Sequence, residues 1–128
     1  MAEEEAIEII PDTVVHRVGG GHKENLQLSQ LEKELAPPGI SVLLGGTPQE
    51  AAVQMQNAFP RSRKWHESVQ RIGTATVETI RAAGFEIIAD PTTRFPNHAR
   101  LIHPNGFAGF TDANLERLTQ AFEDIAED

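Results

Sequence analysis

The densest group of side chains able to do chemistry lies in residues 94–105, RFPNHARLIHPN, which hold two histidines, two arginines and two asparagines. If residues 99–103 form a strand, His98 and Arg100 point to the same face, and the apolar residues that alternate with them point to the other. An imidazole can move a proton near neutral pH, and a guanidinium can hold a phosphate or an oxyanion. The segment therefore predicts His98 and Arg100 as catalytic residues, with Asn97 orienting the substrate.

A second polar pair, His16 and Arg17, lies near the end of a predicted strand over residues 13–18, and three glycines follow at 19–21. Glycines let backbone N–H groups approach an anion, but neither a GxGxxG nor a GxxxxGK[ST] spacing is present, which excludes a Rossmann-type dinucleotide loop. His16 shares a face with two valines, so its alternative interpretation is a hydrogen-bonded core histidine. We expect both residues to bind substrate, Arg17 as an anion holder.

Metal and thiol chemistry are not expected. The sequence contains no cysteine, which removes cysteine-ligated zinc, iron–sulfur clusters and thiol nucleophiles. His98 and His103 are five residues apart and would point to opposite faces of a strand, which disfavours a shared metal ion. His103 is expected to be hydrogen-bonded and partly buried. We predict neither a metal nor a cofactor.

The order of the polar motifs is similar to that of ADP-ribosyltransferase-type domains. In both, a strand-end His or Arg comes first, a serine inside a strand second (here Ser41), and a polar motif near the C-terminal strand third. That family usually carries a catalytic Glu or Gln in the third motif, where this chain has Asn97 and His98 with only Asp90 nearby. The same content of histidine and arginine suits a metal-independent ribonuclease of the kind found among small bacterial toxin domains. Both interpretations stay open.

The elements that must position these residues follow from turn and capping signals. Thr47, Pro48 and Glu50 supply an N-cap, a proline at the first helical position and a capping-box carboxylate. Strands are predicted over residues 13–18, 40–44, 85–89 and 99–103, and helices over 29–35, 48–59, 65–73 and 75–83 and from Thr111 through Ile125. We expect an α+β fold with a mixed or antiparallel sheet of about four short strands, packed by four to five helices.

Composition bounds the domain organisation and the partners. The chain has 128 residues, 39% hydrophobic and 23% charged, which fits one globular domain over residues 11–128 after an acidic, flexible leader over 1–10. The N-terminus is acidic, and no run approaches the roughly 20 apolar residues of a membrane helix, so a cytoplasmic protein is expected. The net charge of −8 works against general affinity for nucleic acid or anionic membranes, although arginines and lysines concentrate over residues 61–100.

The sequence is compatible with two functions from different classes. The first is a small effector-like or toxin-like enzyme domain that acts on a nucleotide, NAD or RNA. It requires His98 and Arg100 to converge in a concave pocket with His16 or Arg17. The second is a non-catalytic protein-interaction module, which requires an exposed apolar patch, for instance around residues 107–110, FAGF. The sequence predicts no particular oligomeric state.

Overall fold

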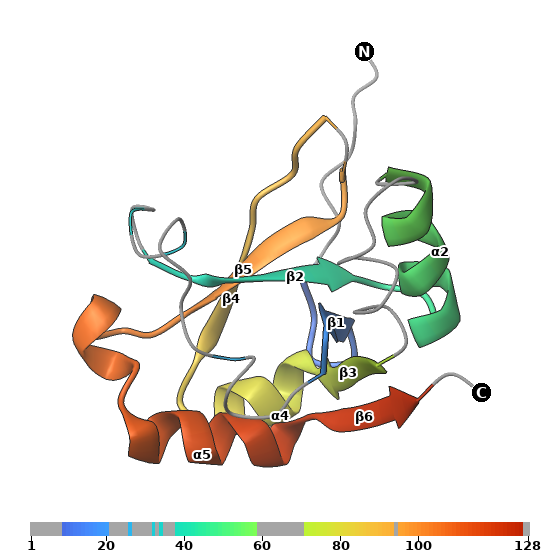
Figure 1. Cartoon of the computed structure of the whole chain (residues 1–128). Coiled ribbons are helices and arrows are strands. Elements are labelled where there is room, and N and C mark those ends of the chain that lie inside the picture. Colours follow the sequence, from blue (N-terminus) through green and yellow to red (C-terminus); the bar gives the residue numbers. More distant parts are fainter. Residues whose placement is uncertain are drawn as a thin grey trace.

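One antiparallel sheet organises the chain (Figure 1). The computed structural model describes residues 9–20, 26, 32, 34, 38–58, 71–93 and 95–126. In chain order the elements are β1 (Val14–Val18), β2 (Ile40–Leu44), α2 (Pro48–Ala58), β3 (Arg71–Thr76), α4 (Val77–Ala82), β4 (Glu86–Ala89), β5 (His98–Ile102), the 3-10 helix η2 (Gly106–Gly109), α5 (Asp112–Ala121) and β6 (Glu123–Ala126). The sheet order of the described strands is β4-β5-β2-β1-β3-β6, which confirms a single α+β domain with an antiparallel sheet.

The predicted strands and the best-capped helix are present. The four expected strands correspond to β1, β2, β4 and β5. The capping box of α2 forms as expected, because the Glu50 amide donates to the Thr47 hydroxyl at 3.1 Å and the Thr47 amide donates to a Glu50 carboxylate oxygen at 2.9 Å. The described residues contain three α-helices. The helix predicted over 29–35 falls on a range of which only Glu32 and Glu34 are described.

The predicted count of about four strands was too low, because β3 was mistaken for helix. Residues 71–76, RIGTAT, were divided between two predicted helices, and residues 65–70 of the first lie outside the described part of the chain. The structure begins α4 only at Val77, because Thr76 is its N-cap. The Thr76 hydroxyl accepts from the Thr79 amide, and the Thr79 hydroxyl accepts from the Thr76 amide, each at 3.3 Å. The capping pair Thr76 and Thr79 therefore marks the end of β3 and the start of α4.

The last predicted helix was too long, and the sixth strand was missed with it. Its apolar spacing through Ile125 indicated helix, yet α5 ends at Ala121 and Phe122 is extended, with φ −101° and ψ 144°. The chain then continues as β6, where Ile125 pairs with Ile72 of β3. Phe122 still reaches the core from this extended position, with 8% of its surface exposed. Pairing with β3 decides the structure here, and the local apolar spacing does not reveal it.

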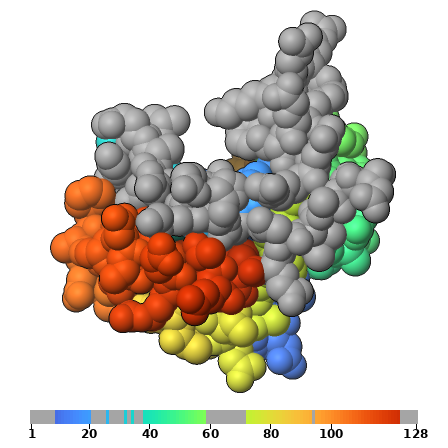
Figure 2. Space-filling view, turned by 60° about the horizontal axis from the view of Figure 1, so that its bottom comes forward, coloured from blue at the N-terminus to red at the C-terminus, as the bar shows by residue number. Residues whose placement is uncertain are grey.

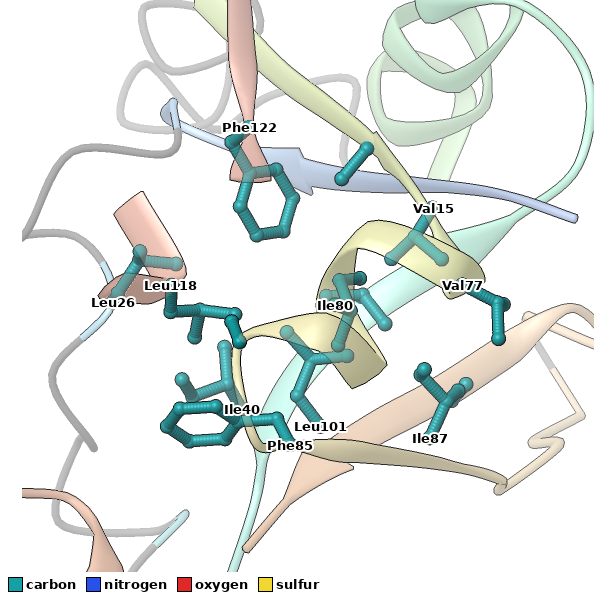
Figure 3. Packing of buried hydrophobic residues seen from close by; sticks show 14 of the residues in the cluster. Val15, Leu26, Ile40, Val77, Ile80, Phe85, Ile87, Leu101, Leu118 and Phe122 are labelled. Carbon is teal, nitrogen blue, oxygen red and sulfur yellow. The ribbon is translucent and has the colours of Figure 1, made fainter. Parts of the chain in front are cut away.

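The two faces of the sheet bury different clusters. On one face, α4 and α5 pack side by side (Figure 2), and Ile80, Leu101 and Leu118 are fully buried between them and the strands (Figure 3). On the other face, α2 packs against β1 and β3 through Met55 and its two buried alanines. Since strand residues alternate between faces, this arrangement decides which predicted site residues can meet.

One threonine of α5 allows a test of the packing. The Thr119 hydroxyl oxygen is buried and has no hydrogen-bond partner among the described residues. Thr119→Val keeps the shape and removes the hydroxyl, so we expect the free energy of unfolding to stay unchanged or rise by up to about 1 kcal/mol. The matched control is Thr111→Val, which removes the hydroxyl that caps α5 by accepting from the Asn114 amide and should cost about 1 kcal/mol. Urea denaturation measures both, and a loss at Thr119 as large as at Thr111 would contradict the prediction.

Candidate functional site

The register of the sheet groups some of the predicted site residues and separates others. His16 of β1 lies opposite Leu43 of β2, and Leu43 lies opposite His98 of β5. The two histidines therefore share the face on which α2 packs, about 10 Å apart at two strand spacings, with Leu43 between them. Arg100 follows His98 on that same face, as predicted. Arg17 alternates with His16 along β1 and leaves the sheet on the opposite face.

His98 is hydrogen-bonded to Asp90, which lies at the other end of the β4–β5 loop. Its Nδ1 lies 2.9 Å from the backbone carbonyl oxygen of Asp90, and its own carbonyl accepts from the Asp90 amide at 2.9 Å. A carbonyl oxygen can only accept, so Nδ1 carries the proton and the neutral ring presents a bare lone pair at Nε2. The His98 side chain is 16% exposed, and Nε2 has no hydrogen-bond partner in the described part of the chain. Nε2 is thus the ring nitrogen that the described residues leave without a hydrogen bond.

The Asp90 carboxylate joins His98 and Arg100. Its Oδ2 lies 3.3 Å from His98 Nδ1 and 3.3 Å from Arg100 Nε. The Arg100 side chain is only 12% exposed, so its guanidinium is a fixed charge beside His98 and not a mobile surface cation. Sequence analysis noted Asp90 only as a nearby acid. The signal that could have found it is its place directly after a predicted strand, in the loop that leads back to His98.

Asn97 is engaged within the fold. Its amide exchanges hydrogen bonds with that of Gln54 in α2, at 2.7 Å from Gln54 Nε2 to Asn97 Oδ1 and 3.2 Å from Asn97 Nδ2 to Gln54 Oε1. Asn97 Nδ2 also donates to the Leu44 carbonyl at the end of β2, at 3.0 Å. These bonds tie α2 to the end of β2 and to the start of β5, beside His98. A substrate would have to compete with Gln54 for this amide.

His16 has partners on both ring nitrogens and no exposed surface. Nε2 lies 3.1 Å from the carbonyl oxygens of both Gly45 and Gly46, and Nδ1 lies 3.0 Å from the Thr74 hydroxyl. Two carbonyl acceptors require Nε2 to carry the proton, which leaves Nδ1 to accept from the hydroxyl. Burial lowers the pKa of His16, against smaller opposing effects of the Gly46 and Gly45 carbonyls and of Glu50. This is the core histidine given above as the alternative, and its role in substrate binding stays a prediction.

Arg17 forms a buried ion pair with Glu32 and supports the backbone of Ser41. Its Nη1 lies 3.4 Å from Glu32 Oε2 and donates to the Ser41 carbonyl oxygen at 2.8 Å, while the Ser41 amide donates to the same Glu32 oxygen at 3.0 Å. Burial lowers the pKa of Arg17, and the Glu32 carboxylate opposes the shift. The register between β1 and β2 covers Val15 with Leu44 and His16 with Leu43, short of Ser41. The side-chain pair therefore supplies the backbone partners that β1 would otherwise give.

His103 is partly buried and hydrogen-bonded, as expected. Its ring meets Phe85 edge to face, with the ring centroids 5.1 Å apart, and its Nδ1 accepts from the Asn105 amide at 3.1 Å. The Gly109 backbone lies so close that a methyl group added there would overlap the imidazole. His103 thus packs the end of β5 against η2.

Only one phenylalanine of the segment 107–110 is strongly exposed. Phe110 packs against the core and meets Phe85 edge to face, with the ring centroids 5.5 Å apart. Phe107 in η2 is 56% exposed. The apolar patch that an interaction module would need is therefore reduced, in this segment, to Phe107.

Several sequence features lie outside the described residues. These are residues 1–8 of the predicted leader, Gly21, the basic run 61–64, Trp65 and Arg94. Among the residues that are described, no three His, Cys, Asp or Glu side chains are placed to hold a metal ion. No helix in the described ranges combines the length and apolarity needed to cross a membrane.

Comparison with known proteins returns no match of any kind: no protein-family model, no curated protein and no solved structure matches this chain.

Proposed function

We propose that this chain is a small effector-like or toxin-like enzyme domain, acting on a nucleotide, NAD or RNA, with His98 as the acid/base catalyst. The observation that carries the proposal is the state of the His98 ring. Nδ1 is occupied by the Asp90 carbonyl at 2.9 Å, while Nε2 has no partner in the described part of the molecule. Such a histidine would be oriented through Nδ1 and would exchange its proton through Nε2, which is the arrangement that general acid/base catalysis requires.

The charges beside the ring fit proton transfer at a phosphate-bearing substrate. His98 Nε2 would take the proton of an attacking hydroxyl or water and return one to the leaving group. The imidazolium formed in between has the Asp90 carboxylate 3.3 Å from Nδ1. Arg100, held by the same carboxylate at 3.3 Å, adds a fixed positive charge near the place where negative charge develops. The three substrate classes share phosphate groups, so the proposal extends to all of them.

The test is a substrate panel with matched histidine variants. NAD, a nucleoside diphosphate and a short RNA are titrated in thermal-shift experiments, and nicotinamide release, phosphate release and RNA cleavage are then followed. For the ligand that stabilises the protein, His98→Gln should lower kcat by about 10²- to 10⁴-fold, the usual contribution of a general acid/base. His103→Gln, five positions along the chain and outside this group, should keep the wild-type turnover.

Two outcomes would contradict the proposal. Equal turnover in His98→Gln and the wild type would remove His98 from the chemistry. Absence of both stabilisation and turnover with the whole panel would favour the non-catalytic interaction module. For that alternative, Phe107→Ser is the informative variant, because this side chain is 56% exposed and its loss should weaken a protein contact.

A further inference from the structure

We infer that Asp90 is a positioning residue for His98: its backbone carbonyl fixes the tautomer of the ring, and its carboxylate holds Arg100 and the ring together. The catalytic meaning of this inference rests on the proposed function. The tautomer itself does not, because it follows from the hydrogen bonds of the folded chain.

The backbone part of the inference rests on a reciprocal pair of contacts. The Asp90 amide donates to the His98 carbonyl, and His98 Nδ1 donates to the Asp90 carbonyl, each at 2.9 Å. Pro91 follows Asp90, and a residue before proline is restricted to extended backbone conformations. The direction of the Asp90 carbonyl is therefore limited by the chain itself. The ring that donates to this carbonyl takes up a defined orientation.

The loop between the two residues is closed by its own hydrogen bonds. The Thr92 amide donates to the Phe95 carbonyl at 3.0 Å, and the Phe95 amide donates to the Thr92 hydroxyl at 2.9 Å. The His98 amide donates to the same Phe95 carbonyl at 3.0 Å. In Figure 1 this loop extends beyond the sheet at the tips of β4 and β5. Bonds inside the loop hold Asp90 and His98 at a fixed separation before any ligand binds, which is the condition for a preorganised site.

The side-chain part of the inference rests on the position of one oxygen. Asp90 Oδ2 lies 3.3 Å from His98 Nδ1 and 3.3 Å from Arg100 Nε, and the Asp90 side chain is 37% exposed. When the His98 ring gains a proton, this oxygen lies between the imidazolium and the Arg100 guanidinium, which β5 places on the same face of the sheet. An amide at the same position keeps the shape and loses the charge. The protonated ring then faces Arg100 without the Asp90 carboxylate between them.

The tautomer is measured by two-bond ¹H–¹⁵N correlation spectra of the histidine rings at pH 8.5, with signals assigned from single His→Gln variants. We expect His98 to carry its proton on Nδ1. His16 is the internal control, because its contacts with the Gly45 and Gly46 carbonyls require the proton on Nε2. A protonated Nε2 at His98 would overturn the inference, and it would do so whether or not the protein is active.

The carboxylate is tested with Asp90→Asn, and Glu86→Gln, in the β4 strand that leads into the loop of Asp90, is the matched control. Asp90→Asn should keep the proton on Nδ1 of His98, since the carbonyl is unchanged, and lower kcat by about 10- to 100-fold with little change in KM. Glu86→Gln loses the same charge from an exposed pair with Arg81 and should leave kcat unchanged. A switch of the tautomer in Asp90→Asn would overturn the role of the carbonyl. An unchanged kcat in an active protein would overturn the role of the carboxylate and leave His98 as catalyst.

Discussion

Replacing Glu32 with alanine is expected to lower the free energy of unfolding by about 3–5 kcal/mol, the size seen when one partner of a buried ion pair is removed. The carboxylate faces the guanidinium of Arg17 at 3.4 Å, and the two side chains are 10% and 15% exposed. Without Glu32, the buried guanidinium of Arg17 loses the carboxylate that faces it, and the Ser41 amide loses its acceptor. Urea or guanidinium denaturation of wild type and variant measures the difference.

Two variants separate the buried pair from ordinary surface charge effects. Glu86→Ala breaks the pair with Arg81, whose side chains are 45% and 41% exposed, and should cost less than about 1 kcal/mol. The double variant Arg17→Met, Glu32→Leu removes both charges from the interior and should recover part of the loss. Recovery should stay incomplete, because the Ser41 amide and carbonyl then lack the partners that the two side chains supply. If Glu32→Ala lowers the free energy of unfolding no more than Glu86→Ala does, the buried pair is no more stabilising than the exposed one.

The parts of the fold that could be predicted from sequence are those with local causes. The N-terminal cap of α2 is predicted from Thr47 and Glu50, three residues apart, and both of its hydrogen bonds are present. Alternation along β5 correctly placed His98 and Arg100 on one face, opposite Leu101, which is fully buried. In both cases the sequence pattern that made the prediction possible spans only a few positions.

The missed parts depend on partners distant in sequence. Ile72 is in a strand because β3 lies between β1 and β6, where it pairs with Ile125, and no local pattern records this pairing. The same limit applies to the candidate site. Asp90 joins it because the β4–β5 loop brings its carbonyl to His98. The sequence predicted that Arg17 would bind an anionic substrate, yet in the fold it forms an ion pair with Glu32, fifteen residues away. A buried charge acquires its partner only when the chain folds.

The second large effect expected is a pH-dependent loss of stability that originates at His16. In the native state burial lowers the pKa of this ring below the ordinary histidine value of 6.5, whereas the unfolded chain keeps the ordinary value. The unfolded state therefore binds more protons as the pH falls below 6.5, and folding becomes less favourable. The contribution is fully present above this value. Below it, stability is lost by up to about 1.4 kcal/mol per pH unit until the native pKa is reached.

The matched variant is His16→Gln, which has no group that titrates in this range. At pH 8 it should be less stable than the wild type by about 2–4 kcal/mol, because glutamine cannot reproduce the bonds to Gly45, Gly46 and Thr74 within the same volume. Denaturant unfolding at pH 8, 7, 6 and 5 gives the difference between the two proteins, in which contributions of the other titrating groups cancel. This difference should shrink as the pH falls from 7 to 5, since only the wild type loses the stability that a neutral His16 provides. A difference that stays constant over this range would mean that the ring takes up its proton equally readily in the folded and unfolded chains.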